Sequence, residues 1–280
     1  MMKSSRCVWG LLAGGVFWSC GPSATTNEAV RPSAPATIDR ETLFRIGQEF
    51  FVERTFDSAA VYYRKSLALD STYGPPLGGL AQLHYDLAMQ NPNRNDPVRM
   101  REFRASLGYY MRMETLGHTD GEMYDRLSEL TYTLGEKELF LNYVKKNIGE
   151  SPDDRQYFNL GLAYGQVGDY ANVIKSQKEA IERFKFSRFI GSFYKQLGNA
   201  YLEVDRQQSA ERTFSAGVEA VNERISAMVK STSASASDAD VERLKEERLF
   251  MLRSLRKIYR IHGQDDRLQE VERQLKGYGD

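Results

Sequence analysis

Apolar side chains recur every three or four residues along most of the chain, beginning near residue 39. The first two runs of this kind contain Leu43, Ile46, Phe50, Ala59, Tyr63 and Leu67. Such spacing gathers the apolar residues on one face of an α-helix, and no segment keeps the strict alternation that a half-buried strand needs. The pattern therefore predicts an all-α body.

The helical pattern also repeats with a fixed internal spacing. A bulky residue is followed by a small residue 4 positions later, an aromatic at 7, a small residue at 16, an aromatic at 20 and a small residue at 23. Two segments fit all places, with Tyr194, Gly198, Tyr201, Ala210, Phe214 and Gly217 in one and Leu43, Gly47, Phe50, Ala59, Tyr63 and Ser66 in the other. Tyr157, Gly161, Tyr164 and Ala180 form a third, in which Val173 and Gln177 are less typical. Small residues let paired helices cross closely, and aromatics fill the space between neighbours.

This spacing resembles the tetratricopeptide repeat, a helix-turn-helix unit of about 34 residues. The resemblance is carried by "YFNLGLAYGQVGDYANVIKSQKEAI" and "YKQLGNAYLEVDRQQSAERTF", with a chain break expected at Gly168-Asp169. It implies a right-handed α-solenoid of about six helix pairs over residues 39–277, with a concave face formed by the first helix of each pair.

Two weaker units lie between these repeats. One begins at Leu77, and its second helix is expected at about Val98–Glu114, after a turn-rich insertion near residues 90–97. The other spans Tyr124–Pro152 with Gly135 at its turn. Its atypical residues are Ser128, Thr131 and Asn147.

A last helix pair is expected at about Val241–His262 and Asp265–Lys276. It follows a second irregular insertion near residues 225–240, which contains the low-complexity run "STSASASDAD". Small polar runs of this kind are typical of loops.

The amino terminus has a different character. Lys3 and Arg6 precede an 11-residue apolar stretch from Val8 to Trp18, which is too short for a bilayer span of about 20 residues. The following Ser19-Cys20-Gly21 resembles the lipobox of bacterial lipoproteins. The resemblance implies a signal peptide over residues 1–19, lipidation of Cys20 and a flexible tether over residues 20–38. Plain secretion and a cytoplasmic location are the alternatives.

The composition of the chain argues against several classes of function. Lys plus Arg and Asp plus Glu each number 38, so no net positive charge favours nucleic-acid binding. No cysteine follows Cys20, and the three histidines lack ligand spacing, so we expect no metal site and no cofactor. Because no phosphate-binding glycine loop or nucleophile motif occurs either, we expect a protein that is not an enzyme.

Binding to a protein or peptide partner is the function that the repeats imply. By resemblance, the concave groove is lined by Arg155, Asn159, Leu162, Gln166, Lys195, Asn199 and Leu202. Some proteins of the family grip a partner's terminal carboxylate with a Lys and Asn pair such as Lys195 and Asn199. The matching places of the next unit hold Phe250 and Ser254 rather than basic groups, so a generic polar lining is favoured.

A second surface feature is a run of cations within "RSLRKIYRIHG". Arg253, Arg256, Lys257 and Arg260 lie opposite an apolar stripe. They are interpreted as a solvated helix face, with contact to anionic lipid or an acidic partner as the alternative.

Together these features predict a non-catalytic lipoprotein of the cell envelope that scaffolds protein–protein contacts. Because Gly21 rather than Asp follows Cys20, the resemblance places it at the outer membrane, facing the periplasm. Two alternatives keep the fold: an assembly or pilotin-type factor for a barrel, secretin or pilus, and a periplasmic accessory protein that binds glycan or peptidoglycan.

Overall fold

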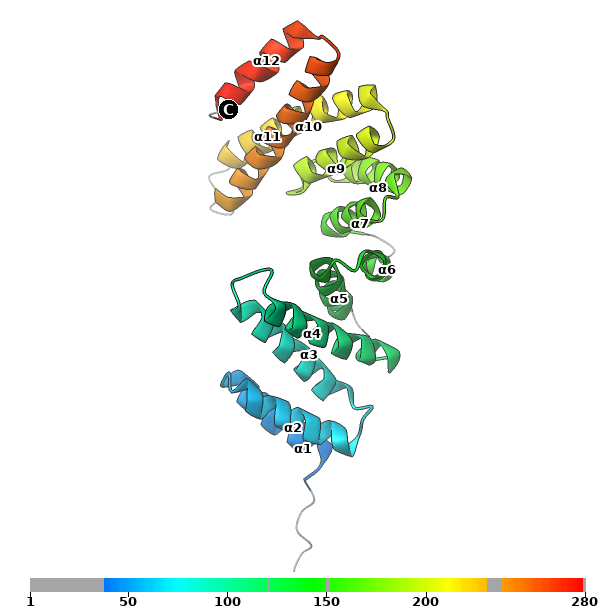
Figure 1. Cartoon of the computed structure of the whole chain (residues 1–280), viewed down its shortest axis with the longest axis vertical. Coiled ribbons are helices and arrows are strands. Elements are labelled where there is room, and N and C mark those ends of the chain that lie inside the picture. Colours follow the sequence, from blue (N-terminus) through cyan, green and yellow to red (C-terminus); the bar gives the residue numbers. More distant parts are fainter. Residues whose placement is uncertain (1–37, 120, 150–151, 231–237, 279–280) are drawn as a thin grey trace, which may run out of the picture. The chain divides into compact units, whose positions relative to one another are not determined.

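The computed structural model describes residues 38–119, 121–149, 152–230 and 238–278. Within these ranges the chain forms twelve α-helices and no strand (Figure 1). In chain order they are α1 (Arg40–Val52), α2 (Phe56–Leu69), α3 (Gly74–Gln90), α4 (Pro97–Thr115), α5 (Gly121–Leu134), α6 (Lys137–Asn147), α7 (Asp154–Gln166), α8 (Tyr170–Arg183), α9 (Ile190–Glu203), α10 (Gln207–Lys230), α11 (Asp238–Ile261) and α12 (Asp265–Lys276).

The helices pack as six consecutive pairs in this part of the chain, α1 with α2 through to α11 with α12. Each second helix also contacts the first helix of the next pair, as α2 contacts α3 and α8 contacts α9. This neighbour-to-neighbour packing is that of an α-solenoid. It confirms the predicted fold class.

Glycines permit the close crossings that the repeat spacing predicts. A Cβ atom on Gly47 of α1 or on Gly79 of α3 would lie 2.7 Å from the ring of Tyr63, which is fully buried between them. A Cβ on Gly198 of α9 would lie 2.3 Å from the ring of Phe214 in α10. Real Cβ contacts are not this short, so these helices approach as they do because the side chains are absent.

Glycines also end helices at two predicted turns. Gly135 and Gly168 have φ angles of 75° and 76°, the left-handed conformation that a helix C-cap often needs. After Gly135 the backbone N–H of Glu136 donates to the carbonyl of Thr131 at 2.9 Å, which satisfies an otherwise free carbonyl. The turn at Gly168 is confirmed as the break between α7 and α8.

The apolar core is divided along the chain. One cluster of buried side chains runs from α7 to α12, a second lies among α3 to α6, and a third lies between α2 and α3. The smallest consists of Phe140, Val144 and Ala163, at the contact between α6 and α7. The core is therefore thinnest where the fourth pair joins the third.

Two insertions were expected, and the structure differs at the second. Residues 91–96 separate α3 from α4, as the turn-rich sequence indicates. Residues 225–230 and 238–240 were expected to be irregular, but they belong to α10 and α11. The physical reason is that Ile225 and Met228 still pack against the core, and that Asp238 and Asp240 favour a helix N-terminus.

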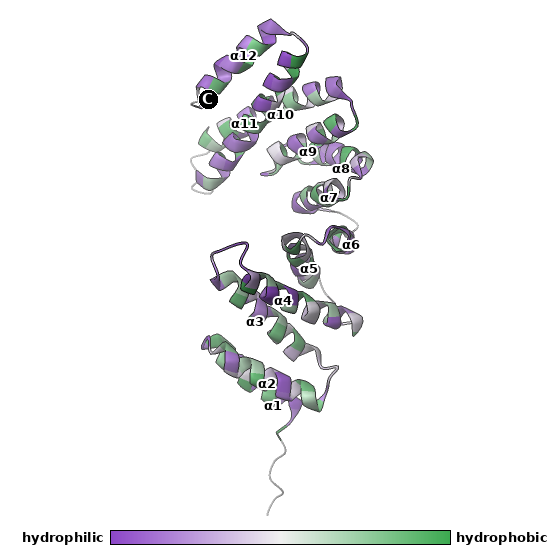
Figure 2. Ribbon diagram, in the orientation of Figure 1, coloured by the Kyte–Doolittle hydropathy of each residue, from purple (hydrophilic) through white to green (hydrophobic). Residues whose placement is uncertain are grey.

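The described helices carry both hydrophobic and hydrophilic residues, as Figure 2 shows. None of those helices is long and apolar enough to cross a membrane. The predicted signal peptide, Cys20 and all of the tether except Ile38 lie outside the described residues.

Candidate partner-binding groove

Two cavities lie along the first helices of the third, fourth and fifth pairs. The larger, about 770 Å³, lies between α5 and α7 and is called the α5–α7 cavity. The smaller, about 430 Å³, lies between α7 and α9 and is called the α7–α9 cavity. Leu162 of α7 lines both, so the two cavities adjoin.

The α5–α7 cavity exists because these two helices do not approach each other. Among the first helices of this region, the backbones of α7 and α9 and of α9 and α11 lie in contact, whereas those of α5 and α7 do not. The lining residues are Glu122, Asp125, Arg126, Ser128, Glu129, Tyr132, Phe140, Arg155, Phe158, Asn159, Leu162, Arg188 and Phe189.

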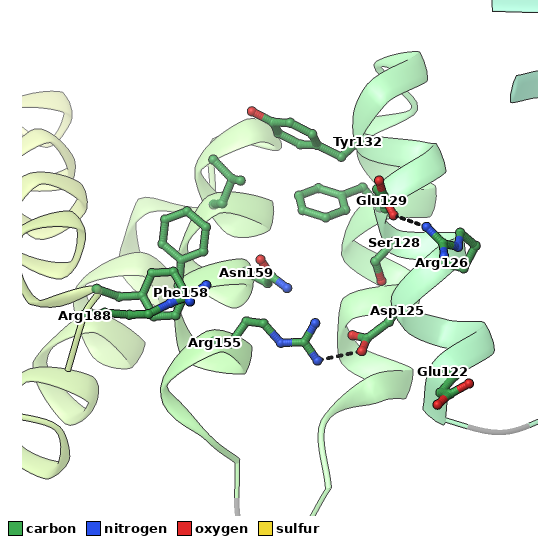
Figure 3. Close-up of a pocket in the computed structure, with 13 residues that line it drawn as sticks. Glu122, Asp125, Arg126, Ser128, Glu129, Tyr132, Arg155, Phe158, Asn159 and Arg188 are labelled. Carbon is green, nitrogen blue, oxygen red and sulfur yellow. Dashed lines mark hydrogen bonds and ion pairs between the residues drawn. The ribbon is translucent and has the colours of Figure 1, made fainter. Parts of the chain in front are cut away.

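The two sides of this cavity carry opposite charge. The α5 side presents Glu122, Asp125 and Glu129, together with Arg126, whose guanidinium is paired with Glu129 at 2.8 Å. The other side presents Arg155 and Arg188, so the α5 side is net negative and the other side is positive (Figure 3). One ion pair spans the space, with Arg155 Nη2 2.6 Å from Asp125 Oδ2. Through that hydrogen bond Asp125 raises the pKa of the Arg155 guanidinium. Both side chains are partly exposed, so the bridge contributes less than about 1 kcal/mol to stability.

Aromatic rings form one wall of the cavity. Phe158 and Phe189 stack with ring centroids 4.9 Å apart, and the guanidinium carbon of Arg188 lies 4.7 Å from the centroid of Phe189. Tyr132, with 45% of its surface exposed, packs against buried Phe140 at 5.3 Å. These rings offer apolar and cation-stacking surface beside the charges.

Ser128 is an unusual member of the lining. Only 4% of the Ser128 surface is exposed, and the hydroxyl has no hydrogen-bond partner among the described residues. Figure 3 places it on the α5 side, across the space from Asn159. Buried hydroxyls are nearly always hydrogen-bonded in proteins, so this group is available to a ligand or to water.

The α7–α9 cavity is shaped by missing side chains. Gly161 and Gly165 lie one turn apart on α7, where they admit the side chains of Gln177 and Gln196 and face the first turn of α8 and the C-terminal half of α9. The lining residues are Gly161, Leu162, Gly165, Gln166, Tyr170, Val173, Gln196, Asn199, Ala200, Leu202 and Glu203.

The structure brings most of the predicted groove residues to these cavities. Arg155 and Asn159 line the first, Gln166, Asn199 and Leu202 line the second, and Leu162 lines both. Lys195 lines neither. Its ammonium lies 5.1 Å from the ring centroid of Phe250 in α11, and Ser254 Oγ donates to the Phe250 carbonyl at 3.0 Å. The Lys and Asn pair is thus split, because Lys195 is held against an aromatic ring.

The cationic run occupies a separate surface. Arg253, Arg256, Lys257 and Arg260 line a hollow of about 440 Å³ with Ile261 near the end of α11. Arg260 is paired with Glu272 of α12 at 3.1 Å.

Sequence reasoning missed the α5 side of the first cavity and its aromatic wall. The missed residues include Asp125, Ser128, Glu129, Tyr132, Phe158, Arg188 and Phe189. The one available signal was Ser128, an atypical residue of its repeat unit. No spacing rule indicates that α5 and α7 stand apart, since this depends on how α6 packs.

Comparisons with known proteins agree with this architecture. A family model described as tetratricopeptide repeat matches residues 155–185, which cover almost all of α7 and α8. No curated protein matches the sequence significantly.

Several solved structures are similar in fold. A MamA protein superposes with a TM-score of 0.52 at 20% identity, covering 71% of this chain and 98% of that one. YrrB, described as a TPR protein with an unusual peptide-binding site, gives 0.53 at 13% identity, covering 69% and 92%. A tetratricopeptide repeat protein from Parabacteroides merdae ATCC 43184 gives 0.50 at 15% identity, covering 85% and 79%. Residues 155–185 thus match the tetratricopeptide repeat, and the six consecutive helix pairs share the α-solenoid fold of these structures.

Proposed function

We propose that the protein is a non-catalytic scaffold that binds an extended segment of a partner protein along the first helices α5, α7 and α9. The observation that carries this proposal is the pair of adjoining cavities, which share Leu162 and together are lined by six of the seven predicted groove residues. A segment lying across both would bury apolar surface at Leu162 and Leu202 and meet polar side chains on either side.

The chemistry of the α5–α7 cavity supports a peptide over a small apolar ligand. Carboxylates face guanidinium groups across it, beside an aromatic wall and the Ser128 hydroxyl, which has no partner among the described residues. A polypeptide supplies the donors, acceptors and side chains that such a mixed surface requires. Peptide binding is also the property stated for YrrB, whose fold is similar.

The proposed location is the cell envelope. We propose that Cys20 carries the lipid and that residues 21–38 tether the repeats to the membrane. The support is the sequence alone: the charged start, the short apolar run and Ser19-Cys20-Gly21. A tethered scaffold meets partners that are themselves at the membrane.

Site-specific photo-crosslinking in native membranes tests the groove. A photoreactive residue at position 162 is expected to capture a discrete partner, whereas one at position 175, on the exposed face of second helix α8, is not. Equal products from both positions would refute the groove. The captured species separates the alternatives: barrel, secretin or pilus subunits indicate an assembly factor, and glycan without protein indicates an accessory protein.

Metabolic labelling tests the anchor independently. Radioactive palmitate is expected to label the wild-type chain and to be lost in Cys20→Ala. Labelling that persists in Cys20→Ala would refute the lipid anchor and would leave the groove untouched.

A further inference from the structure

The α7–α9 cavity contains hydrogen-bond acceptors that nothing in the described chain satisfies. The side-chain oxygens of Gln166 and Gln196, both in its lining, are buried and have no hydrogen-bond partner in the structure. A third such oxygen belongs to Gln177 of α8, which is fully buried behind Gly161. Native proteins rarely leave buried acceptors unpaired, so this cluster calls for donors from outside.

Two of the amides are held in this orientation by hydrogen bonds. Gln177 Nε2 donates to the Tyr157 carbonyl at 3.0 Å, and Gln196 Nε2 donates to the Phe158 carbonyl at 3.4 Å. Since the nitrogen of each amide faces the backbone of α7, the oxygen is the atom left over. The missing side chain of Gly161 provides the room, because a Cβ there would lie 1.9 Å from Gln177 Nε2 and 2.1 Å from Gln196 Oε1.

The rest of the lining has one sign of charge. Glu203 contributes a carboxylate, and no residue that lines this cavity is Lys or Arg. Lys195, which by resemblance was expected to reach the groove, instead places its ammonium 5.1 Å from the ring centroid of Phe250. An anionic group entering here would meet acceptors and a like charge, which disfavours a terminal carboxylate.

We propose that the α7–α9 cavity is a specificity site for an arginine side chain of the partner segment. Its guanidinium would donate to Gln166 and Gln196 and lie near Glu203, while its methylene stem would pack on Leu162, Val173 and Leu202. Arginine suits the site better than lysine, because its planar group presents five donors and is more weakly hydrated. Tyr170, also in the lining, offers an aromatic surface for the same group.

This inference rests on the proposed function, because it assumes that a partner segment enters the groove. The test uses the full chain and capped seven-residue Ala/Ser peptides with one central guest residue. The guests are arginine, citrulline, norleucine and glutamate. Citrulline keeps donors but is neutral, and norleucine keeps the apolar stem without donors.

Binding is followed by the ¹H–¹⁵N signals of the Gly161 and Gly165 backbone amides and of the Gln166 and Gln196 side chains. We expect the arginine peptide to shift these signals and to bind about tenfold more tightly than the norleucine peptide, since charge-assisted hydrogen bonds are lost in the latter. Citrulline is expected to lie between them, and glutamate is expected not to bind.

Variants locate the effect. Gln166→Met with Gln196→Met keeps side-chain length and removes both acceptors, so the preference for arginine over norleucine should disappear. Gln48→Met in α1, which lines none of the cavities described above, is the matched control and should retain it. Far-UV circular dichroism shows whether the variants are folded, and the peptide series on the wild type does not depend on them.

The outcomes separate this site from the broader proposal. Equal binding of norleucine and arginine would overturn the arginine site while leaving a groove that binds peptide. Tighter binding of the glutamate peptide, or shifts confined to Ser128 and Asn159, would also overturn it. Absence of any shift with the arginine peptide would overturn the arginine site. The groove itself is tested separately, by crosslinking from position 162.

Discussion

The substitution Gly198→Ala tests whether close helix crossings hold this solenoid together. Its new Cβ would lie 2.3, 2.6 and 2.7 Å from three ring carbons of Phe214. Phe214 is fully buried and its ring also contacts Phe250, with centroids 6.4 Å apart, so the ring has little freedom to withdraw. Overpacking of this kind destabilises by about 1–3 kcal/mol.

Gly108→Ala provides the matched control. Gly108 is an exposed residue within α4, and a Cβ there would meet nothing within 4 Å. Replacing a helical glycine by alanine favours the helix by about 1 kcal/mol, and this gain is common to both variants. The difference between their unfolding free energies therefore isolates the overpacking energy, with Gly108→Ala the more stable by about 1–3 kcal/mol. Relative to the wild type, we expect Gly108→Ala to be stabilised and Gly198→Ala to lose up to about 2 kcal/mol.

Urea unfolding of the full chain, followed by far-UV circular dichroism, measures this difference. Tryptophan fluorescence is unsuitable, because both tryptophans, Trp9 and Trp18, precede the helical part of the chain. If Gly198→Ala were as stable as Gly108→Ala, the close approach of α9 and α10 would not be a structural requirement, and the reasoning from repeat spacing would fail.

Three further substitutions make separate tests. Tyr63→Phe removes a hydroxyl that has no hydrogen-bond partner among the described residues, and burial raises the pKa of this hydroxyl to about 12. Because no hydrogen bond is lost, we expect urea unfolding to show unchanged stability or a gain of about 1 kcal/mol. Burial raises the pKa of Glu247 above 4.5, although Ser192 donates to it; the folded state therefore binds its proton more tightly than the unfolded state. Consequently the wild type should lose stability relative to Glu247→Gln as pH rises from 4.5 to about 7, and a constant difference would contradict this. Asp125→Asn breaks the ion pair with Arg155 at 2.6 Å, and because both groups are partly exposed, the unfolding free energy should change by less than about 1 kcal/mol; a larger loss would mean that the pair holds α5 to α7.

The helical pairs could be predicted from sequence where the repeat spacing is regular. The expected helix at Val98–Glu114 is observed as Pro97–Thr115, and the expected pair near the C-terminus is observed as α11 and α12. These predictions succeed because amphipathic period and glycine turns are local properties. The ends of α10 and α11 could not be predicted, since Ile225 and Met228 are helical through packing on a core that sequence alone does not place.

Only the α7 and α9 side of the candidate site could be predicted, because the rest depends on packing between residues far apart in the sequence. The face of α7 and α9 follows from helical period, and six of its seven expected residues line a cavity. The orientation of Lys195 does not follow from period, because it depends on Phe250, 55 positions later in the sequence. The α5 side of the first cavity likewise depends on α6 meeting α7 through Phe140, Val144 and Ala163 while α5 stands apart.

Three of the five departures from the repeat pattern lie in or directly behind the two cavities, and this connects the sequence to the proposed site. The other two, Thr131 and Asn147, line neither cavity. Ser128, atypical for its place in the repeat, lines the α5–α7 cavity, and its buried hydroxyl has no partner in the described part of the chain. Val173 and Gln177, the two atypical residues of the repeat at Tyr157, respectively line the α7–α9 cavity and supply an unsatisfied oxygen behind it. A polar residue in a position normally filled by small or apolar side chains lowers stability unless something satisfies it. Sequences tend to break their own local rules at functional sites, so these exceptions support the proposed groove.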